Sequence, residues 1–247
     1  MRILLVNDDG VNAEGINILA ECLKKEHDVW IVAPDRNRSA ASHAITMTKP
    51  LKINKLRDKV FSCSGQPVDC TAAGFHALVN PKPDLVISGI NKGFNIGTDI
   101  IYSGTCAAAR QAAFYGVPAI AVSLEIRSEN DGWYFHSLAE FVKENLEKFI
   151  ALCKEDEEET FININAYSTE KFSDWKLTFP SSRNYHDKIT LVEGPDGCTY
   201  SFFTGGDIST TRQDNSDFKA VEDGFVSVSK ILSQPSALTD DTETKNE

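Results

Sequence analysis

Acidic, amide and hydroxyl side chains follow three short apolar runs of this chain. They are Asp8 and Asp9 after residues 3–6, Ser39 after residues 29–33, and Asn95 after residues 84–88. Continuous apolar runs of this length are typical of strands that are buried on both faces of a parallel sheet. Ligands of open α/β sheets bind beyond the carboxyl ends of such strands. We therefore expect these side chains to meet at one edge of a sheet.

The first segment, Asp8-Asp9-Gly10, differs from the glycine-rich turn of dinucleotide-binding folds. Two adjacent carboxylates would repel a bare phosphate. A divalent cation between the two carboxylates would make phosphate binding favourable, because the carboxylates neutralise the cation while it bridges to the phosphate. An isolated pair of this kind is more often a helix cap and turn, and this alternative stays open.

Residues 88–105 contain four glycines and lead into an alanine-rich helix. Glycine permits close approach of the backbone to a ligand, and Asn95 offers an amide oxygen to a hard cation. Ser103, Gly104 and Thr105 stand at the predicted helix start, where N–H groups and hydroxyls can bind phosphate. The loop lacks the ending of a Walker A motif, and Ser103 or Thr105 in the role of helix cap is the alternative.

Taken together, Asp8, Asp9, Ser39 and Asn95 form an all-oxygen set with a formal charge of −2. Such a set suits Mg²⁺ or Mn²⁺. The histidines show no spacing of a zinc site, so a zinc hydrolase is disfavoured. Only His43, close after Ser39, is a histidine worth testing. Ser39 itself is, by pattern alone, more often a solvated cap than a ligand.

The elements that position these residues form two β-α-β units. Strands are predicted at residues 3–6, 29–33, 84–88, 119–124 and 161–165, with helices at 16–23, 67–79, 105–115 and 133–152. The predicted fold class is α/β, a mostly parallel sheet flanked by helices, with a smaller β-rich C-terminal extension. We expect a catalytic core at residues 1–166, the extension at 167–232, and a disordered tail at 233–247.

Composition narrows the function classes. The 247 residues are 41% hydrophobic and carry a net charge of −11, which disfavours binding to a nucleic-acid polymer. The six cysteines lack any Cys-x-x-Cys spacing, so we interpret them as reduced. No apolar run approaches the roughly 18 residues of a membrane span. We expect a cytoplasmic protein without membrane contacts.

The three segments in this order closely resemble the motifs of the SurE family, the metal-dependent 5′-nucleotidases also called survival protein E. The similarity rests on residues 7–15, 33–43 and 88–105 and continues through residues 118–123. It implies a Rossmann-like N-terminal part and a C-terminal extension used in homodimer or homotetramer assembly. It also implies hydrolysis of nucleoside 5′-monophosphates, and possible action on short-chain polyphosphate. One divalent metal ion per subunit is implied at Asp8, Asp9, Ser39 and Asn95.

We predict that Asp8 and Asp9 are catalytic, and that the metal polarises the phosphate. The remaining phosphate oxygens would be held by Asn91, Ser103, Gly104 and Thr105. Direct attack by water and a phospho-enzyme on Asp8 both remain open. So do a phosphatase of another family, a non-catalytic nucleotide-binding module and a structural role, although the acidic first turn and the glycine-rich loop argue against them.

Three positions depart from the family pattern. Ala40 stands where glycine is common, Gln111 where glutamate is common, and Phe225 where tyrosine is common. We expect Ala40 to shift the loop that carries Ser39 slightly. For Gln111 and Phe225 we expect effects on packing or assembly more than on chemistry.

Overall fold

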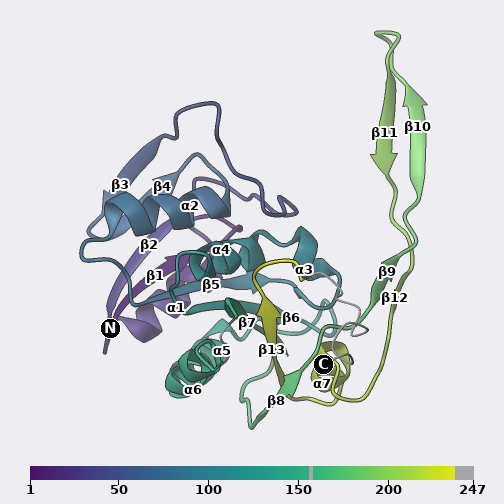
Figure 1. Ribbon diagram of the computed structural model, residues 1–247. Coiled ribbons are helices and arrows are strands. Elements are labelled where there is room, and N and C mark those ends of the chain that lie inside the picture. The colour runs from purple at the N-terminus through teal and green to yellow at the C-terminus, as the bar shows by residue number, and fades with distance from the viewer. Residues whose placement is uncertain (156–157, 237–247) are drawn as a thin grey trace, which may run out of the picture.

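A nine-stranded sheet forms the centre of the protein (Figure 1). The computed structural model describes residues 1–155 and 158–236. Along the sheet the strands are β3 (Ile53–Arg57), β4 (Val60–Cys63), β2 (Asp28–Pro34), β1 (Arg2–Val6), β5 (Leu85–Lys92), β6 (Ala119–Glu125), β7 (Thr160–Tyr167), β13 (Val226–Leu232) and β8 (Trp175–Thr178). The six strands from β4 to β7 run parallel, whereas β3 and β13 pair antiparallel to their neighbours β4 and β7.

The strand order reverses between β1 and β5, because the chain builds outward from β1 to β2 and β4 before it returns to β5. Their registers place Val6 beside Ser88, so the segments that follow both strands leave the sheet at the same edge. A reversal of this kind opens a crevice in which ligands of doubly wound sheets bind. The predicted α/β class is confirmed, and the motif-bearing loops lie at the switch point.

Helices cover both faces of the sheet (Figure 1). On one face α1 (Glu14–Leu23) packs against α5 (Phe135–Glu144), which is followed by α6 (Leu146–Leu152). On the other face α2 (Pro67–Ala73) packs against α4 (Gly104–Ala113). A π-helical turn at Gly74–Leu78 extends α2, and the short α3 (Asp99–Tyr102) precedes α4. Two apolar cores therefore sandwich the sheet, whose central strands are apolar on both sides.

The single helix expected at residues 133–152 was wrong, because the structure divides it into α5 and α6 at Asn145. The side-chain amide of Asn145 donates a hydrogen bond of 3.0 Å to the carbonyl of Phe141. Asparagine competes in this way with the helical backbone. The apolar period continues across the break, which is why the sequence pattern shows one helix.

Residues 167–232, the expected extension, are distributed over two parts of the molecule. Strands β8 and β13 complete the central sheet, and α7 (Asp217–Glu222) packs against β13. Between β8 and α7, strands β9 (Arg183–Tyr185), β10 (Ile189–Glu193), β11 (Thr199–Phe203) and β12 (Ile208–Thr210) form an arm that projects from the body (Figure 1). The predicted tail lies outside the described residues from residue 237 onward.

The base of the arm holds the start of α3. The guanidinium of Arg183 pairs with the carboxylate of Asp99 at 2.8 Å, and the phenol of Tyr185 donates to the same carboxylate. The backbone N–H of Arg183 donates to Thr98 Oγ1 at 3.0 Å. These contacts join the arm to the glycine-rich loop. Within the described residues, no helix combines the length and hydropathy that a membrane crossing needs.

Candidate active site

The turn after β1 is fixed by its own side chains. Asn7 accepts a hydrogen bond from the N–H of Gly10 at 3.1 Å and donates to its carbonyl at 2.9 Å. Gly10 has a φ of +106°, and a Cβ there would lie 3.2 Å from the backbone of Arg36. Only glycine fits this turn comfortably. Asp8 and Asp9 are therefore presented next to the loop that follows β2.

Asp8 lies against the N-terminus of α4. Its side chain is 4% exposed and accepts a hydrogen bond of 2.5 Å from the hydroxyl of Thr105. Burial raises the pKa of Asp8, and hydrogen bonds from Thr105 and the backbone at Gly104 oppose this effect. A Cβ at Gly104 would lie 2.8 Å from the Asp8 Cβ, so the helix and the carboxylate are in direct contact.

Asp9 is half-buried beside the end of β5. It accepts hydrogen bonds from the N–H of Lys92 at 3.2 Å and from the side chain of Asn37 at 3.4 Å. Burial and the neighbouring charge of Asp8 raise the pKa of Asp9 to about 6. Among the described residues, neither Asp8 nor Asp9 forms an ion pair. The two carboxylates thus lie together without a salt bridge from the described residues, and the charge of Lys92 only partly offsets the rise in the pKa of Asp9.

Ser39 lies on the loop after β2, which is tied to the first turn. The N–H of Arg38 donates to the carbonyl of Asp8 at 2.7 Å, and its guanidinium donates to the carbonyl of Ser64 at 2.7 Å. The N–H of Ser39 donates to Asn37 Oδ1 at 2.8 Å. The hydroxyl of Ser39 has no hydrogen-bond partner among the residues that the structure describes, and the residue is exposed.

Asn95 lies toward the same edge of the sheet, against the C-terminal halves of β6 and β7. It is 6% exposed, and its Nδ2 donates to the hydroxyl of Ser123 at 2.8 Å. Its Oδ1 accepts no hydrogen bond within the described part of the chain. Asn95 makes no hydrogen bond to Asp8 or Asp9, so all four predicted ligands share an edge without forming a closed network of their own.

The predicted phosphate-binding residues flank this edge, and most of them have partners in the protein. Ser103 Oγ accepts a hydrogen bond from the N–H of Cys106 at 3.0 Å. Ser103 therefore caps α4, which is the alternative role that the sequence left open for it. Asn91 donates to the carbonyl of Gly93 at 2.9 Å. Thr105 and Gly104 contact Asp8.

His43 lies away from this group. Its Nε2 is 2.9 Å from Gln111 Oε1, and its ring packs on Phe114. Gln111 is seven residues beyond Gly104 along α4, a distance of about 10 Å in a helix. The structure therefore places His43 and Gln111 together in packing, as expected for Gln111, and distant from Asp8.

The donor set fits a hard divalent cation. No group of three His, Cys, Asp or Glu side chains that could hold a metal occurs in residues 1–155 and 158–236. A site here must therefore combine two carboxylates with neutral oxygens. That combination is provided by the carboxylates of Asp8 and Asp9, which form no ion pair among the described residues, by the unpartnered amide oxygen of Asn95 and by the free hydroxyl of Ser39.

Sequence reasoning missed the residues that support Asn95. Asn163 and Asn165 on β7 and Ser123 on β6 are fully buried and bond to it. Asp217 at the start of α7 is also buried, and its Oδ2 accepts from the N–H of Gly97 at 2.7 Å. A detectable signal was the pair of asparagines two positions apart in an otherwise apolar strand.

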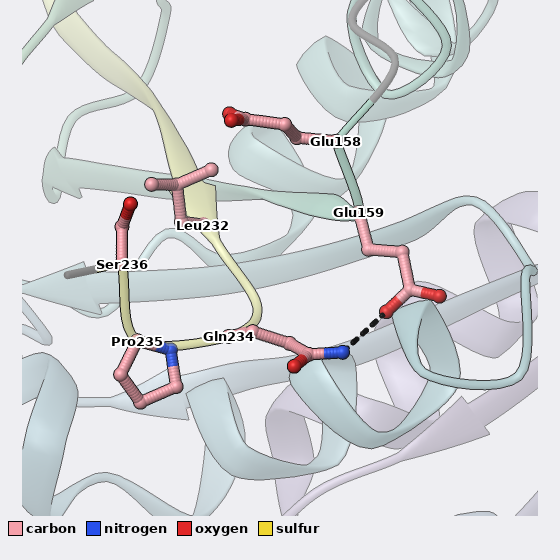
Figure 2. A pocket seen from close by; sticks show the side chains of 6 residues that line it. All are labelled: Glu158, Glu159, Leu232, Gln234, Pro235 and Ser236. Carbon is pink, nitrogen blue, oxygen red and sulfur yellow. Dashed lines mark hydrogen bonds between the residues drawn. The ribbon is translucent and has the colours of Figure 1, made fainter. Parts of the chain in front are cut away.

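A separate cavity of about 250 Å³ lies at the opposite edge of the sheet (Figure 2). It is formed by residues before β7 and after β13, namely Glu158, Glu159, Leu232, Gln234, Pro235 and Ser236. Because β7 starts at Thr160, this is the amino end of the parallel strands. None of the sequence-predicted site residues lines it, and the switch-point edge remains the candidate active site.

The strand order, the flanking helices and the polar groups at the switch point define an α/β protein of the Rossmann-like class. The family model described as "Survival protein SurE" matches residues 3–187. The chain belongs to the SurE family.

Relatives with this fold extend over nearly the whole chain. The protein named "5'-nucleotidase SurE" of Geotalea daltonii is 40% identical over 94% of this chain and 92% of its own length. That of Thermosipho melanesiensis, with the same name, is also 40% identical, over 94% and 91%. The crystal structure of the SurE protein from Aquifex aeolicus has a TM-score of 0.78 at 32% identity and covers 96% of this chain and 95% of its own.

Proposed function

We propose that this protein is a metal-dependent 5′-nucleotidase, which releases phosphate from nucleoside 5′-monophosphates. The observation that carries the proposal is the pair of buried Asp8 and half-buried Asp9, which lies beside the N-terminus of α4 and forms no ion pair among the described residues. The relatives named 5′-nucleotidase support the substrate class, because their identity of 40% covers the whole motif-bearing part of the chain.

One Mg²⁺ or Mn²⁺ per subunit would be held by Asp8, Asp9, Ser39 and Asn95. The bound cation supplies positive charge, which offsets both carboxylates and the oxygens of the phosphate. The exposed hydroxyl of Ser39 and the half-buried carboxylate of Asp9 leave this side of the site accessible to substrate.

The substrate phosphate would bind beside the carboxylate pair, next to Ser103, Gly104 and Thr105 at the start of α4 and to Asn91 on β5. In the reaction, a water oxygen bonds to phosphorus, the bond from phosphorus to O5′ breaks, and a proton passes to O5′. We assign the attack to water, because Asp8 is 4% exposed and held by Thr105. Asp9, which is more accessible, orients that water.

Short-chain polyphosphate is a second candidate substrate. Its terminal phosphoryl group offers the same chemistry, and the neighbouring phosphates need nearby cations. The exposed side chain of Arg36 and the exposed Lys92 flank the turn at Asp9 and supply positive charge.

We also propose that the arm mediates assembly into a homodimer or homotetramer. Apolar side chains on β10 and β11 are largely exposed, with Leu191 at 66% and Phe203 at 75%. Such a surface is typical of an interface. The six free cysteines of the chain agree with a reducing compartment, and we place the enzyme in the cytoplasm.

The test is phosphate release from nucleoside 5′-monophosphates, short polyphosphate and a generic phosphomonoester, with Mg²⁺, Mn²⁺ or EDTA. We expect release that EDTA abolishes and either cation restores. Asp9→Asn should lower kcat by at least about a hundredfold, the scale of losing one stabilising group at a transition state. Asp58→Asn, on the turn between β3 and β4, is the matched control and should leave kcat unchanged. Equal turnover in both variants, or full activity in EDTA, would contradict the proposal.

A further inference from the structure

Two asparagine side chains on β7 hold the peptide groups of Asn95. Asn163 and Asn165 are fully buried, and their positions two residues apart put them on the same face of the strand. Asn165 Oδ1 accepts from the N–H of Asn95 at 2.8 Å, and its Nδ2 donates to the carbonyl of Asn95 at 3.1 Å. One side-chain amide thus pairs with both peptide groups of Asn95, as a neighbouring strand would.

Asn163 adds a second bond to the same carbonyl. Its Nδ2 donates to the oxygen of Asn95 at 2.7 Å, and its Oδ1 lies 3.5 Å from the thiol sulfur of Cys106. The thiol donates to Oδ1, which orients the amide so that Nδ2 faces Asn95. The carbonyl of Asn95 therefore has two donors at fixed positions.

With its backbone fixed, Asn95 has one polar atom left. The side-chain Nδ2 is bonded to Ser123 Oγ at 2.8 Å, and Oδ1 accepts nothing from the described residues. The Asn95 side-chain amide is thus placed by its bond to Ser123 and by the two asparagines that hold its backbone, with Nδ2 on Ser123 Oγ and Oδ1 as the free atom.

We infer that Asn163 and Asn165 are positioning residues of the metal site, which act through Asn95 and do not touch the metal or the substrate. This inference rests on the proposed function, because it assigns Asn95 Oδ1 to the cation. Groups that orient a metal ligand typically change metal affinity by about 10- to 100-fold when they are removed. A purely structural role, in which the amides only satisfy a buried loop, would change stability and leave metal affinity unchanged.

The same sheet offers a matched control. Ser227 and Ser229 on β13 pair in register with Asn165 and Asn163, and both are fully buried. Their hydroxyls bond to Thr178 Oγ1 at 2.9 and 2.7 Å. This cluster is a buried polar network next to the asparagines, and none of its bonds reaches Asn95. Thr178→Val removes both bonds with little change of shape.

The experiment is a Mn²⁺ titration of the metal-free full chain, in which free Mn²⁺ is measured by its electron paramagnetic resonance signal. Variants are Asn165→Leu, Asn163→Leu and Thr178→Val, each with its urea unfolding curve. We expect the Kd for Mn²⁺ to rise at least about tenfold in Asn165→Leu and about threefold in Asn163→Leu, which keeps the bonds of Asn165. Thr178→Val should stay within about twofold of wild type, whatever its loss of stability.

Kinetics provide a second readout. In the asparagine variants, excess Mn²⁺ should restore kcat to within about threefold of wild type with an unchanged KM for the nucleotide, because the metal ligands themselves remain. If Asn165→Leu does not fold, Asn163→Leu carries the test. Unchanged Mn²⁺ affinity in a folded asparagine variant overturns the inference while the proposed function stands. Failure of the wild-type protein to bind Mn²⁺ overturns both.

Discussion

At the residue scale, the site keeps two carboxylates where their ionisation is unfavourable. Burial raises the pKa of Asp8, and burial together with the charge of Asp8 raises the pKa of Asp9. Without a cation this arrangement lowers the free energy of unfolding near neutral pH. The reason is that both carboxylates ionise less favourably in the folded protein than in the unfolded chain. Function at this site is therefore expected to oppose stability.

Asp9→Asn should stabilise the metal-free protein at neutral pH. The folded pKa of Asp9 is about 6, above its ordinary value of 3.8, so the stability linked to its protonation is complete below pH 3.8 and is lost as the pH rises through 6. Asp9→Asn has no ionisable group at this position, so its stability does not fall as the pH rises through 6. Thermal unfolding in EDTA should show a higher Tm for Asp9→Asn than for wild type at pH 8, and a smaller difference at pH 5. A lower Tm at pH 8 would contradict the assignment.

Ala40→Gly should stabilise the loop that carries Ser39. Ala40 has a φ of +57°, in the left-handed region where a Cβ is unfavourable. This explains the preference for glycine that the family pattern indicates. The substitution should raise the free energy of unfolding by up to about 1 kcal/mol, partly offset by the freedom that glycine adds to the unfolded chain. Urea unfolding measures it.

The neighbouring Ala41→Gly is the control for that measurement. Ala41 has no positive φ, so glycine there only adds freedom to the unfolded chain. It should lower the free energy of unfolding by about 0.4–1 kcal/mol. The two substitutions should thus change the free energy of unfolding in opposite directions. A change in the same direction would argue against strain at Ala40.

At the scale of elements, the close packing of α1 on β5 supports the site. Gly15 lies in the first turn of α1, and a Cβ there would be 2.0 Å from the carbonyl oxygen of Ile90. Ile90 is followed by Asn91 and by Lys92, whose N–H donates to Asp9. The helix can approach the strand because position 15 has no side chain.

Gly15→Ala should therefore affect both stability and catalysis. The added methyl group must displace backbone, which typically costs about 1–3 kcal/mol in a packed interior. The displacement moves the end of β5, and kcat should fall by more than the unfolded fraction explains. Urea unfolding and phosphate release at the same temperature test this. Gly116→Ala is the control for catalysis, because its φ of +71° makes alanine destabilising while no atom lies within 4 Å of its Cβ position.

The order of the central elements, and the meeting of the motif-bearing loops at one edge of the sheet, could be predicted from sequence, because buried parallel strands are contiguous apolar runs. The break at Asn145 could not, since the apolar period runs through it. Asn163 and Asn165 were also missed. Their role depends on a loop about 70 positions earlier in the chain, and no local pattern reports such a contact.

At the scale of the whole molecule, the arm is an insertion between two strands of the same sheet. β8 precedes it, β13 follows it after α7, and these two strands pair with each other. Phe179 and Ser216 bridge the two ends of the insertion. The body therefore closes without the outer hairpin, β10 and β11, whose partner strands are each other.

Replacing the outer apolar side chains should dissociate the assembly and spare the body. In the combined variant Leu191→Ser, Phe202→Ser and Phe203→Ser, we expect light scattering to report a smaller species than wild type. The main thermal transition should move by only a few degrees, because these side chains are largely exposed in the single chain. Thr190→Ala on the same hairpin is the control. An unchanged mass in the triple variant would place the interface elsewhere.

An outer hairpin with only itself to pair with has a thermodynamic consequence. Two-stranded hairpins are marginally stable in water, and β10 with β11 buries little of its apolar surface within one chain. In the proposed assembly its order is supplied by mass action, so that folding of this segment depends on protein concentration while folding of the sheet does not. Amide hydrogens of the hairpin should exchange faster on dilution, whereas those of β1 and β5 keep their protection. The free energy of unfolding of the outer hairpin would thus depend on protein concentration, whereas that of the central sheet would not.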